Sequence, residues 1–92
     1  MIKSFQHKGL EKFFRSNSKA GIIPSHAAKL SDQLTRLEFA HAPEDLDVPG
    51  YFFHRLHGNL AGHWSIRVNG NWRLTFTFSG NDAELVDYTD YH

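Results

Sequence analysis

Histidines and arginines in the second half of this chain have the chemistry needed to cleave RNA. His54, His57 and the final residue, His92, can each act as a general acid or base, because imidazole exchanges protons near neutral pH. Arg73 can stabilise the charge that develops on a transferring phosphoryl group. Cleavage of RNA by its own 2′-hydroxyl requires a base, an acid and a cation beside the phosphate, without a metal or a protein nucleophile. These residue types are therefore sufficient for that reaction.

The spacing of His54 and His57 is also compatible with metal ligation. No clear pair of further ligands follows in the sequence. On a regular strand, positions 54 and 57 would face opposite sides of the sheet, unless Gly58 already bends the chain. We therefore predict no metal site and no cofactor, and keep a metal-binding domain only as an alternative.

The chain ends in Asp90, Tyr91 and His92, shortly after the apolar pair Leu85-Val86. Two interpretations are open. The end can be a frayed tail, as chain termini commonly are. Alternatively, a last strand brings these side chains to a functional site.

The segment from residue 62 to residue 78 predicts a β-hairpin, because apolar and polar residues alternate on both sides of a turn. A two-residue turn at Asn69-Gly70 would place Ile66 beside Arg73. A three-residue loop, 69–71, keeps all apolar residues on one face, so we predict that register. Its apolar pairs are Val68 with Trp72, Ile66 with Leu74, and Trp64 with Phe76. The other face, predicted to be open, carries His63, Ser65, Arg67, Arg73, Thr75 and Thr77.

This register places Arg67 directly opposite Arg73. Like charges across a strand pair destabilise a sheet by up to about 1 kcal/mol. A phosphate would relieve the repulsion by accepting hydrogen bonds from both guanidinium groups. Alternatively, Asp87 or Asp90 neutralises both arginines.

The remaining pattern predicts a single α+β domain over residues 1–92. We expect a short strand at residues 1–5, helices at 7–15 and about 25–40, a connector at 40–50, and an antiparallel sheet of about four strands. The helices are expected to cover the apolar face of the sheet. His7, His26 and His41 lie outside the candidate site and are expected at the surface.

Composition limits the possible partners. Ten Lys and Arg balance ten Asp and Glu, so strong bulk attraction to polyanions is not expected. The segment 54–81 nevertheless contains no acidic residue and includes Arg55, Arg67 and Arg73, which could bind a phosphate locally. The chain has no cysteine, no membrane-spanning run and no signal-peptide pattern, so we expect a cytoplasmic protein with no membrane partner.

The sequence resembles the HigB-type toxins of the RelE superfamily over nearly its whole length. The similar stretches are MIKSFQHKGLEKFF, SKAG, PGYFFHRLHGNLAGHWSIRVNGNWRLTF and the final DYTDYH. The resemblance implies a microbial-ribonuclease-like fold and a toxin of a type II toxin–antitoxin pair. It also implies a ribosome-dependent endonuclease that cleaves mRNA in the ribosomal A site without a metal.

The resemblance carries functional roles to particular positions of this chain. The family's site residues fall on His54, position 57, Arg73, Asp90, Tyr91 and His92. Relatives usually have lysine where this chain has His57, so a permanent cation is missing there. With these roles, the last strand would deliver residues 90–92 to the edge of the active site.

The resemblance further implies several macromolecular partners. These are the 70S ribosome with its mRNA and a cognate HigA-like antitoxin with a helix-turn-helix, through which the complex would bind operator DNA. The alternative is a non-catalytic module that binds RNA or the antitoxin through a degenerate site.

Overall fold

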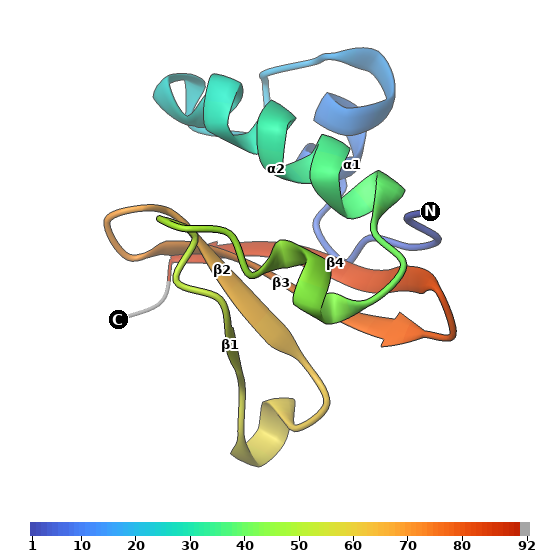
Figure 1. The fold of residues 1–92 in the computed structure, drawn as a ribbon. Helices are drawn as coiled ribbons and strands as arrows, with labels where there is room; N and C mark the ends of the chain where they lie inside the picture. The colour runs from blue at the N-terminus through green and yellow to red at the C-terminus, as the bar shows by residue number, and fades with distance from the viewer. Residues whose placement is uncertain (91–92) are drawn as a thin grey trace.

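The computed structural model describes residues 1–90, in which two helices cover one face of a four-stranded antiparallel sheet (Figure 1). This arrangement confirms the predicted α+β fold. The strands follow one another in the order β1-β2-β3-β4. The elements are α1 (Lys8–Ser16), α2 (Ala27–Phe39), β1 (His54–Arg55), β2 (Trp64–Asn69), β3 (Trp72–Ser79) and β4 (Asp82–Asp90). Within these residues, neither helix is long and apolar enough to cross a membrane.

Helix α1 starts one residue later than predicted because His7 caps it. The ring Nδ1 of His7 accepts a hydrogen bond from the Leu10 amide at 2.9 Å, which satisfies one of the unpaired donors of the first turn. The helix packs tightly on the loop that follows it. A Cβ atom on Gly9 would lie 2.6 Å from the carbonyl oxygen of Gly21, so this contact requires glycine.

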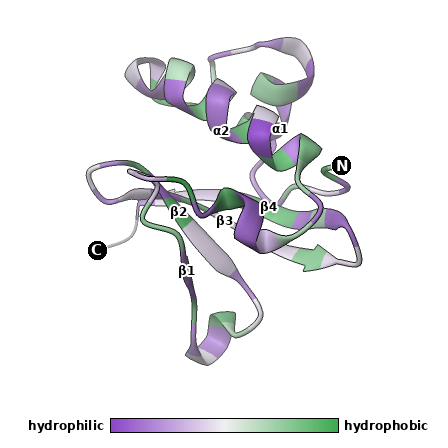
Figure 2. Ribbon diagram, viewed as in Figure 1, coloured by the Kyte–Doolittle hydropathy of each residue, from purple (hydrophilic) through white to green (hydrophobic). Residues whose placement is uncertain are grey.

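Helix α2 is amphipathic, as the spacing of its leucines predicts. Hydrophilic and hydrophobic bands alternate along its ribbon in Figure 2, and Leu30, Leu34 and Leu37 are buried against the sheet. A short 3₁₀ turn, Pro24–His26, precedes it. The fully buried Gln33 amide donates to the backbone oxygen of Arg67 at 2.7 Å, and so ties α2 to β2.

The register of the β2–β3 hairpin confirms two of the three predicted apolar pairs. Trp64 lies opposite Phe76, and Ile66 lies opposite Leu74. The predicted loop was wrong. Trp72 pairs with Asn69 instead of Val68, because a bulge between Arg67 and Asn69 takes up one residue.

The N-terminal segment does not form the predicted continuous strand. Residues 1–5 lie parallel to β4 through two isolated bridges, at Ile2 and at Phe5. Between these bridges Leu85 adopts a positive φ of 54°, and its amide bonds to the Ser4 hydroxyl at 2.9 Å. This local turn of β4 interrupts the backbone ladder.

The prediction that His26 lies at the surface was wrong. Its side chain is buried, and its Nδ1 lies 2.7 Å from the hydroxyl of Tyr88. Its ring also makes a T-shaped contact with Trp72, whose ring lies tilted against that of Tyr88 with the centroids 4.6 Å apart. The hydrogen-bond partner that allows His26 to be buried is therefore 62 residues away in the sequence. The local sequence shows only a helix start that is expected to face solvent.

Because Tyr51 and Tyr88 are buried, we expect the protein to become less stable at alkaline pH. Burial raises the pKa of Tyr88 above 10.0, and burial together with the Asp32 carboxylate raises the pKa of Tyr51. The unfolded chain then loses these protons at lower pH than the folded protein does. The free energy of unfolding is therefore expected to fall above about pH 10, by at most about 1.4 kcal/mol per pH unit for each tyrosine.

Urea unfolding of the wild type and of Tyr51→Phe at several pH values tests this expectation. The variant should show a shallower decline of the unfolding free energy between pH 9 and pH 11. Equal slopes for the two proteins would contradict the assignment.

Candidate functional site

The face of the sheet that points away from the helices, called here the outer face, brings the polar residues of four strands together. One row across it consists of His54, Ser65, Thr75 and Asp87, which are successive cross-strand partners. The neighbouring row consists of Arg67, Arg73 and Thr89. The residues between these rows are core residues, as alternation along the strands requires.

The expectation that this face is open was wrong at its centre. Ser65 is 2% exposed and Thr75 is 5% exposed. His54 is exposed, whereas Arg67 and Arg73 are half-buried. The centre of the outer face therefore consists of buried hydroxyl groups, and the histidine and arginine side chains around it are more exposed.

Arg73 has hydrogen-bond donors that no acceptor within residues 1–90 satisfies. Its Nε and Nη1 atoms are both buried. The salt bridges seen within that range join Met1 to Asp82 and Arg15 to Glu11, so the alternative in which Asp87 neutralises the arginines is not seen there. Buried guanidinium donors are normally paired. An anion such as a phosphate oxygen would supply the acceptor.

Arg67, the cross-strand partner of Arg73, is engaged differently. Its Nε donates to the carbonyl oxygen of Gly70 at 3.2 Å, and its guanidinium carbon lies 5.3 Å from the centre of the Phe52 ring. The two arginines face each other as predicted. Of the two, Arg73 is the one with buried donors that lack an acceptor within residues 1–90.

His54 is held in a defined orientation by its own segment. Its Nδ1 lies 3.0 Å from the carbonyl oxygen of Phe52. A carbonyl can only accept, so the proton of this hydrogen bond belongs to Nδ1. The other ring nitrogen, Nε2, is then the one that can take a proton from a substrate.

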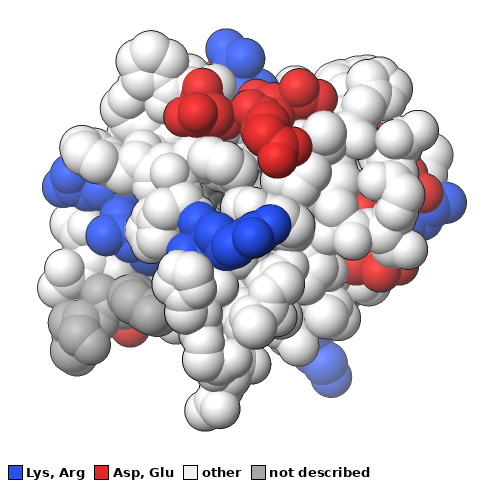
Figure 3. Space-filling view, turned by 60° about the horizontal axis from the view of Figure 1, so that its bottom comes forward, with Lys and Arg blue, Asp and Glu red and all other residues white. Residues whose placement is uncertain are grey.

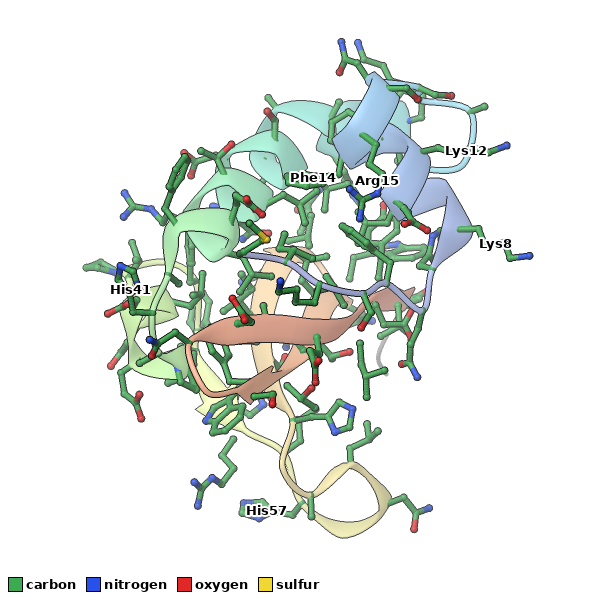
Figure 4. All side chains as sticks on the ribbon, turned by 90° about the vertical axis from the view of Figure 1, so that its right-hand side faces the viewer. Lys8, Lys12, Phe14, Arg15, His41 and His57 are labelled. Atoms are coloured by element: carbon green, nitrogen blue, oxygen red, sulfur yellow. The ribbon has the colours of Figure 1, made fainter. Side chains whose placement is uncertain are left out.

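Two predicted site residues lie away from these rows. The guanidinium of Arg55 lies 5.6 Å from the Trp64 ring centre, on the opposite face from His54. His57 follows the end of β1 and occupies the position before the 3₁₀ turn Gly58–Leu60 without a capping hydrogen bond from its side chain, in a loop that extends beyond the sheet (Figure 4). Within residues 1–90, no three His, Asp or Glu side chains are grouped to hold a metal ion.

The C-terminal site residues are only partly described. Asp90 is the cross-strand partner of Trp72, which places it on the side of Trp72 and Tyr88 and not on that of Arg73. Tyr91 and His92 lie outside the described residues. The site roles of all three residues remain predictions.

Phe52, whose ring contacts Arg67, was not among the site residues predicted from the sequence. The backbone of this residue has a positive φ of 51°, and its side chain is 60% exposed. Such a conformation costs a non-glycine residue about 1–3 kcal/mol, whereas an exposed cation–π contact returns about 0.5–1 kcal/mol. No sequence signal marks this position, because left-handed conformations are otherwise typical of glycine and asparagine.

Charge on this side of the molecule is divided into small groups. Figure 3 shows basic side chains near the centre and at the left of the view, with a cluster of acidic side chains above them. No single positive surface extends across this view. The division agrees with the formal net charge of zero.

The fold has a counterpart among solved structures. Among solved structures, the YoeB–YefM complex from Staphylococcus aureus contains a chain that superimposes with a TM-score of 0.63 at 22% identity, covering 100% of this chain and 98% of that one. At this level of identity the likeness concerns the fold alone.

Sequence comparison defines the family more narrowly. The family described as RelE-like toxin of type II toxin–antitoxin system HigB matches residues 3–92. Endoribonuclease HigB of Proteus vulgaris is 39% identical, with complete coverage of both chains. Toxin HigB-1 of Vibrio cholerae serotype O1 is also 39% identical, over 100% of this chain and 98% of its own length. The chain therefore belongs to the HigB-like toxins, and the resemblance noted in its sequence is confirmed.

Proposed function

We propose that this HigB-like toxin is a ribosome-dependent endoribonuclease that cleaves mRNA in the ribosomal A site. The observation that carries the proposal is the outer face, where Arg73 has unpaired buried donors one row away from the exposed His54. The full-length similarity to an endoribonuclease supports it. No metal is required for the reaction that these groups would perform.

The reaction is an attack of the RNA's own 2′-hydroxyl on the adjacent phosphate. Nε2 of His54 takes the hydroxyl proton, the O2′–P bond forms, and Arg73 stabilises the charge that develops on the phosphoryl oxygens. The P–O5′ bond then breaks. His92 or Tyr91 gives a proton to the departing oxygen. The resemblance also implies that Asp90 orients a histidine, and the position of Asp90 opposite Trp72 excludes His54, on the other face, from being that histidine. The products are a 2′,3′-cyclic phosphate and a 5′-hydroxyl.

The balanced charge of the chain supports the proposal that cleavage depends on the ribosome. With ten basic and ten acidic residues, the protein has little long-range attraction for free RNA. A programmed ribosome presents the codon in a fixed position, which replaces the missing binding energy. The proposed partners are therefore the 70S ribosome, its mRNA and a HigA-like helix-turn-helix antitoxin that links the pair to operator DNA, all in the cytoplasm.

Primer extension on programmed ribosomes and on the same mRNA without ribosomes tests the proposal. We expect cleavage within the A-site codon and almost none in free mRNA. Equal cleavage of both substrates would refute ribosome dependence. Cleavage of neither would favour the alternative, a non-catalytic binding module.

Position 57 tests the effect of a missing permanent cation. Where relatives usually carry lysine, this chain carries His57 at the start of the 3₁₀ turn Gly58–Leu60. His57→Lys is expected to raise the rate of mRNA cleavage on programmed ribosomes, because an ammonium group beside the phosphate stabilises the charge that develops there. Unchanged rates in both His57→Lys and His57→Ala would show that position 57 plays no part.

A further inference from the structure

The side chain of Phe52 borders the outer face without belonging to the hydrophobic core. It is 60% exposed, and one side of its ring carries the guanidinium of Arg67 at 5.3 Å. Its left-handed backbone is unfavourable for phenylalanine, and core packing does not hold it, because the ring lies outside the core cluster. A strained, exposed aromatic residue of this kind is a candidate for function.

The backbone carbonyl groups of Tyr51 and Phe52 form hydrogen bonds with two residues of the candidate site. The carbonyl oxygen of Tyr51 accepts a hydrogen bond from the Arg67 amide at 2.7 Å. The carbonyl oxygen of Phe52 itself accepts from Nδ1 of His54 at 3.0 Å. The same turn therefore orients the proposed base and presents the aromatic ring.

The ring lies at the end of the arginine row. Arg67 contacts Phe52 with its guanidinium group and is the cross-strand partner of Arg73. Neighbouring strands are about 4.8 Å apart, so the ring lies on the order of 10 Å from Arg73. A phosphate at Arg73 would bring a neighbouring nucleotide of a single strand within reach of the ring.

We propose that Phe52 is a stacking platform for a base of the RNA strand next to the phosphate held by Arg73. This inference rests on the proposed function of the same site. The occupant follows from the chemistry: a flat uncharged ring backed by a guanidinium favours the face of a nucleobase, and buried donors at Arg73 favour the backbone of the same strand. Phe52 thus acts in substrate binding and not in proton transfer.

The test compares four proteins: the wild type, Phe52→Asn, Phe52→Trp and Phe39→Asn. Asparagine tolerates the left-handed backbone, so it removes the ring but keeps the carbonyl that orients His54. Tryptophan retains a stacking surface. Phe39 is 76% exposed on α2, in the helical layer that covers the other face of the sheet, and its replacement controls for the loss of an exposed phenylalanine.

Steady-state cleavage on programmed ribosomes is the first measurement. Phe52→Asn is expected to raise KM roughly 5- to 100-fold, the range found when an aromatic stacking partner of a base is removed, with kcat and its pH profile nearly unchanged. Phe52→Trp and Phe39→Asn should resemble the wild type. Equal KM values for Phe52→Asn and the wild type would overturn the inference, and a changed pH profile would assign Phe52 to the positioning of His54 instead.

A binding measurement separates this inference from the proposed function. The probe is a short single-stranded RNA with 2′-O-methyl groups, which prevent cleavage, and one 2-aminopurine, whose fluorescence decreases on stacking. Quenching that is lost in Phe52→Asn but kept in Phe39→Asn would support the platform even if the wild type cleaves nothing. Quenching that is equal in all four proteins, or absent from the wild type at high protein concentration, would overturn it.

Discussion

Replacing Arg73 with alanine is expected to lower the rate of mRNA cleavage on programmed ribosomes by about 100- to 1,000-fold, the usual cost of removing a group that stabilises transition-state charge. The same substitution should leave the melting temperature unchanged or slightly higher. Nε and Nη1 of Arg73 are buried without an acceptor in residues 1–90, and the side chain faces another arginine, so its removal relieves repulsion. Activity would then fall while stability stays the same or rises. This is the pattern expected where a functional group lowers the stability of the folded protein.

Arg67→Ala is the matched control for this prediction. Arg67 occupies the partner position on β2 but is engaged with Gly70 and Phe52. Its loss should relieve the same repulsion with a smaller effect on the rate. Equal rates for Arg73→Ala and the wild type, or a clear loss of stability in Arg73→Ala, would assign Arg73 a structural role.

Deletion of His92 is expected to remove most growth inhibition when the protein is expressed in bacteria, with a melting temperature close to that of the wild type. A terminal side chain contributes little to core packing, whereas the loss of one acid/base group costs about 10²- to 10⁴-fold in rate. This prediction rests on the sequence, because His92 lies outside the described residues.

The control for the deletion is His41→Ala. His41 is an exposed histidine in the connector that follows α2 (Figure 4), and its loss should leave toxicity intact. A C-terminal tag keeps the imidazole of His92 but crowds the site, so its effect should depend on the length of the linker. Full toxicity of the deletion variant would exclude His92 from the reaction and leave Tyr91 as the candidate acid.

The arrangement of the sheet could be predicted because one face is apolar. Alternation through Trp64 and Ile66 on one strand, and Leu74 and Phe76 on the next, permits one register, since a shift by one residue would expose every apolar side chain. This register alone places Arg67 opposite Arg73. The bulge at Val68 could not be predicted from this alternation. Val68 is buried in the structure, and the predicted register also placed it on the apolar face, so the apolar pattern does not distinguish the two arrangements.

Other features depend on contacts between distant parts of the chain, which a local pattern does not contain. His26 is buried because Tyr88 on the last strand provides a hydroxyl group for its ring. The turn that contains Phe52 is held by a backbone hydrogen bond from the Arg67 amide on β2 to the carbonyl oxygen of Tyr51. For the same reason, the hairpin pattern alone does not show that, of the two facing arginines, Arg73 has unsatisfied buried donors within residues 1–90 and Arg67 has none there.

In the proposed reaction, the RNA's own 2′-hydroxyl attacks the phosphate at the outer face. A programmed ribosome carrying mRNA with a single 2′-deoxynucleotide immediately 5′ of the cleaved phosphate tests this step directly, with the all-ribose mRNA as the control. We expect the all-ribose mRNA to yield a 2′,3′-cyclic phosphate and a 5′-hydroxyl, and the deoxy-substituted mRNA to remain uncut at that position. Cleavage of the substituted mRNA at an undiminished rate, or products with a 5′-phosphate, would contradict it.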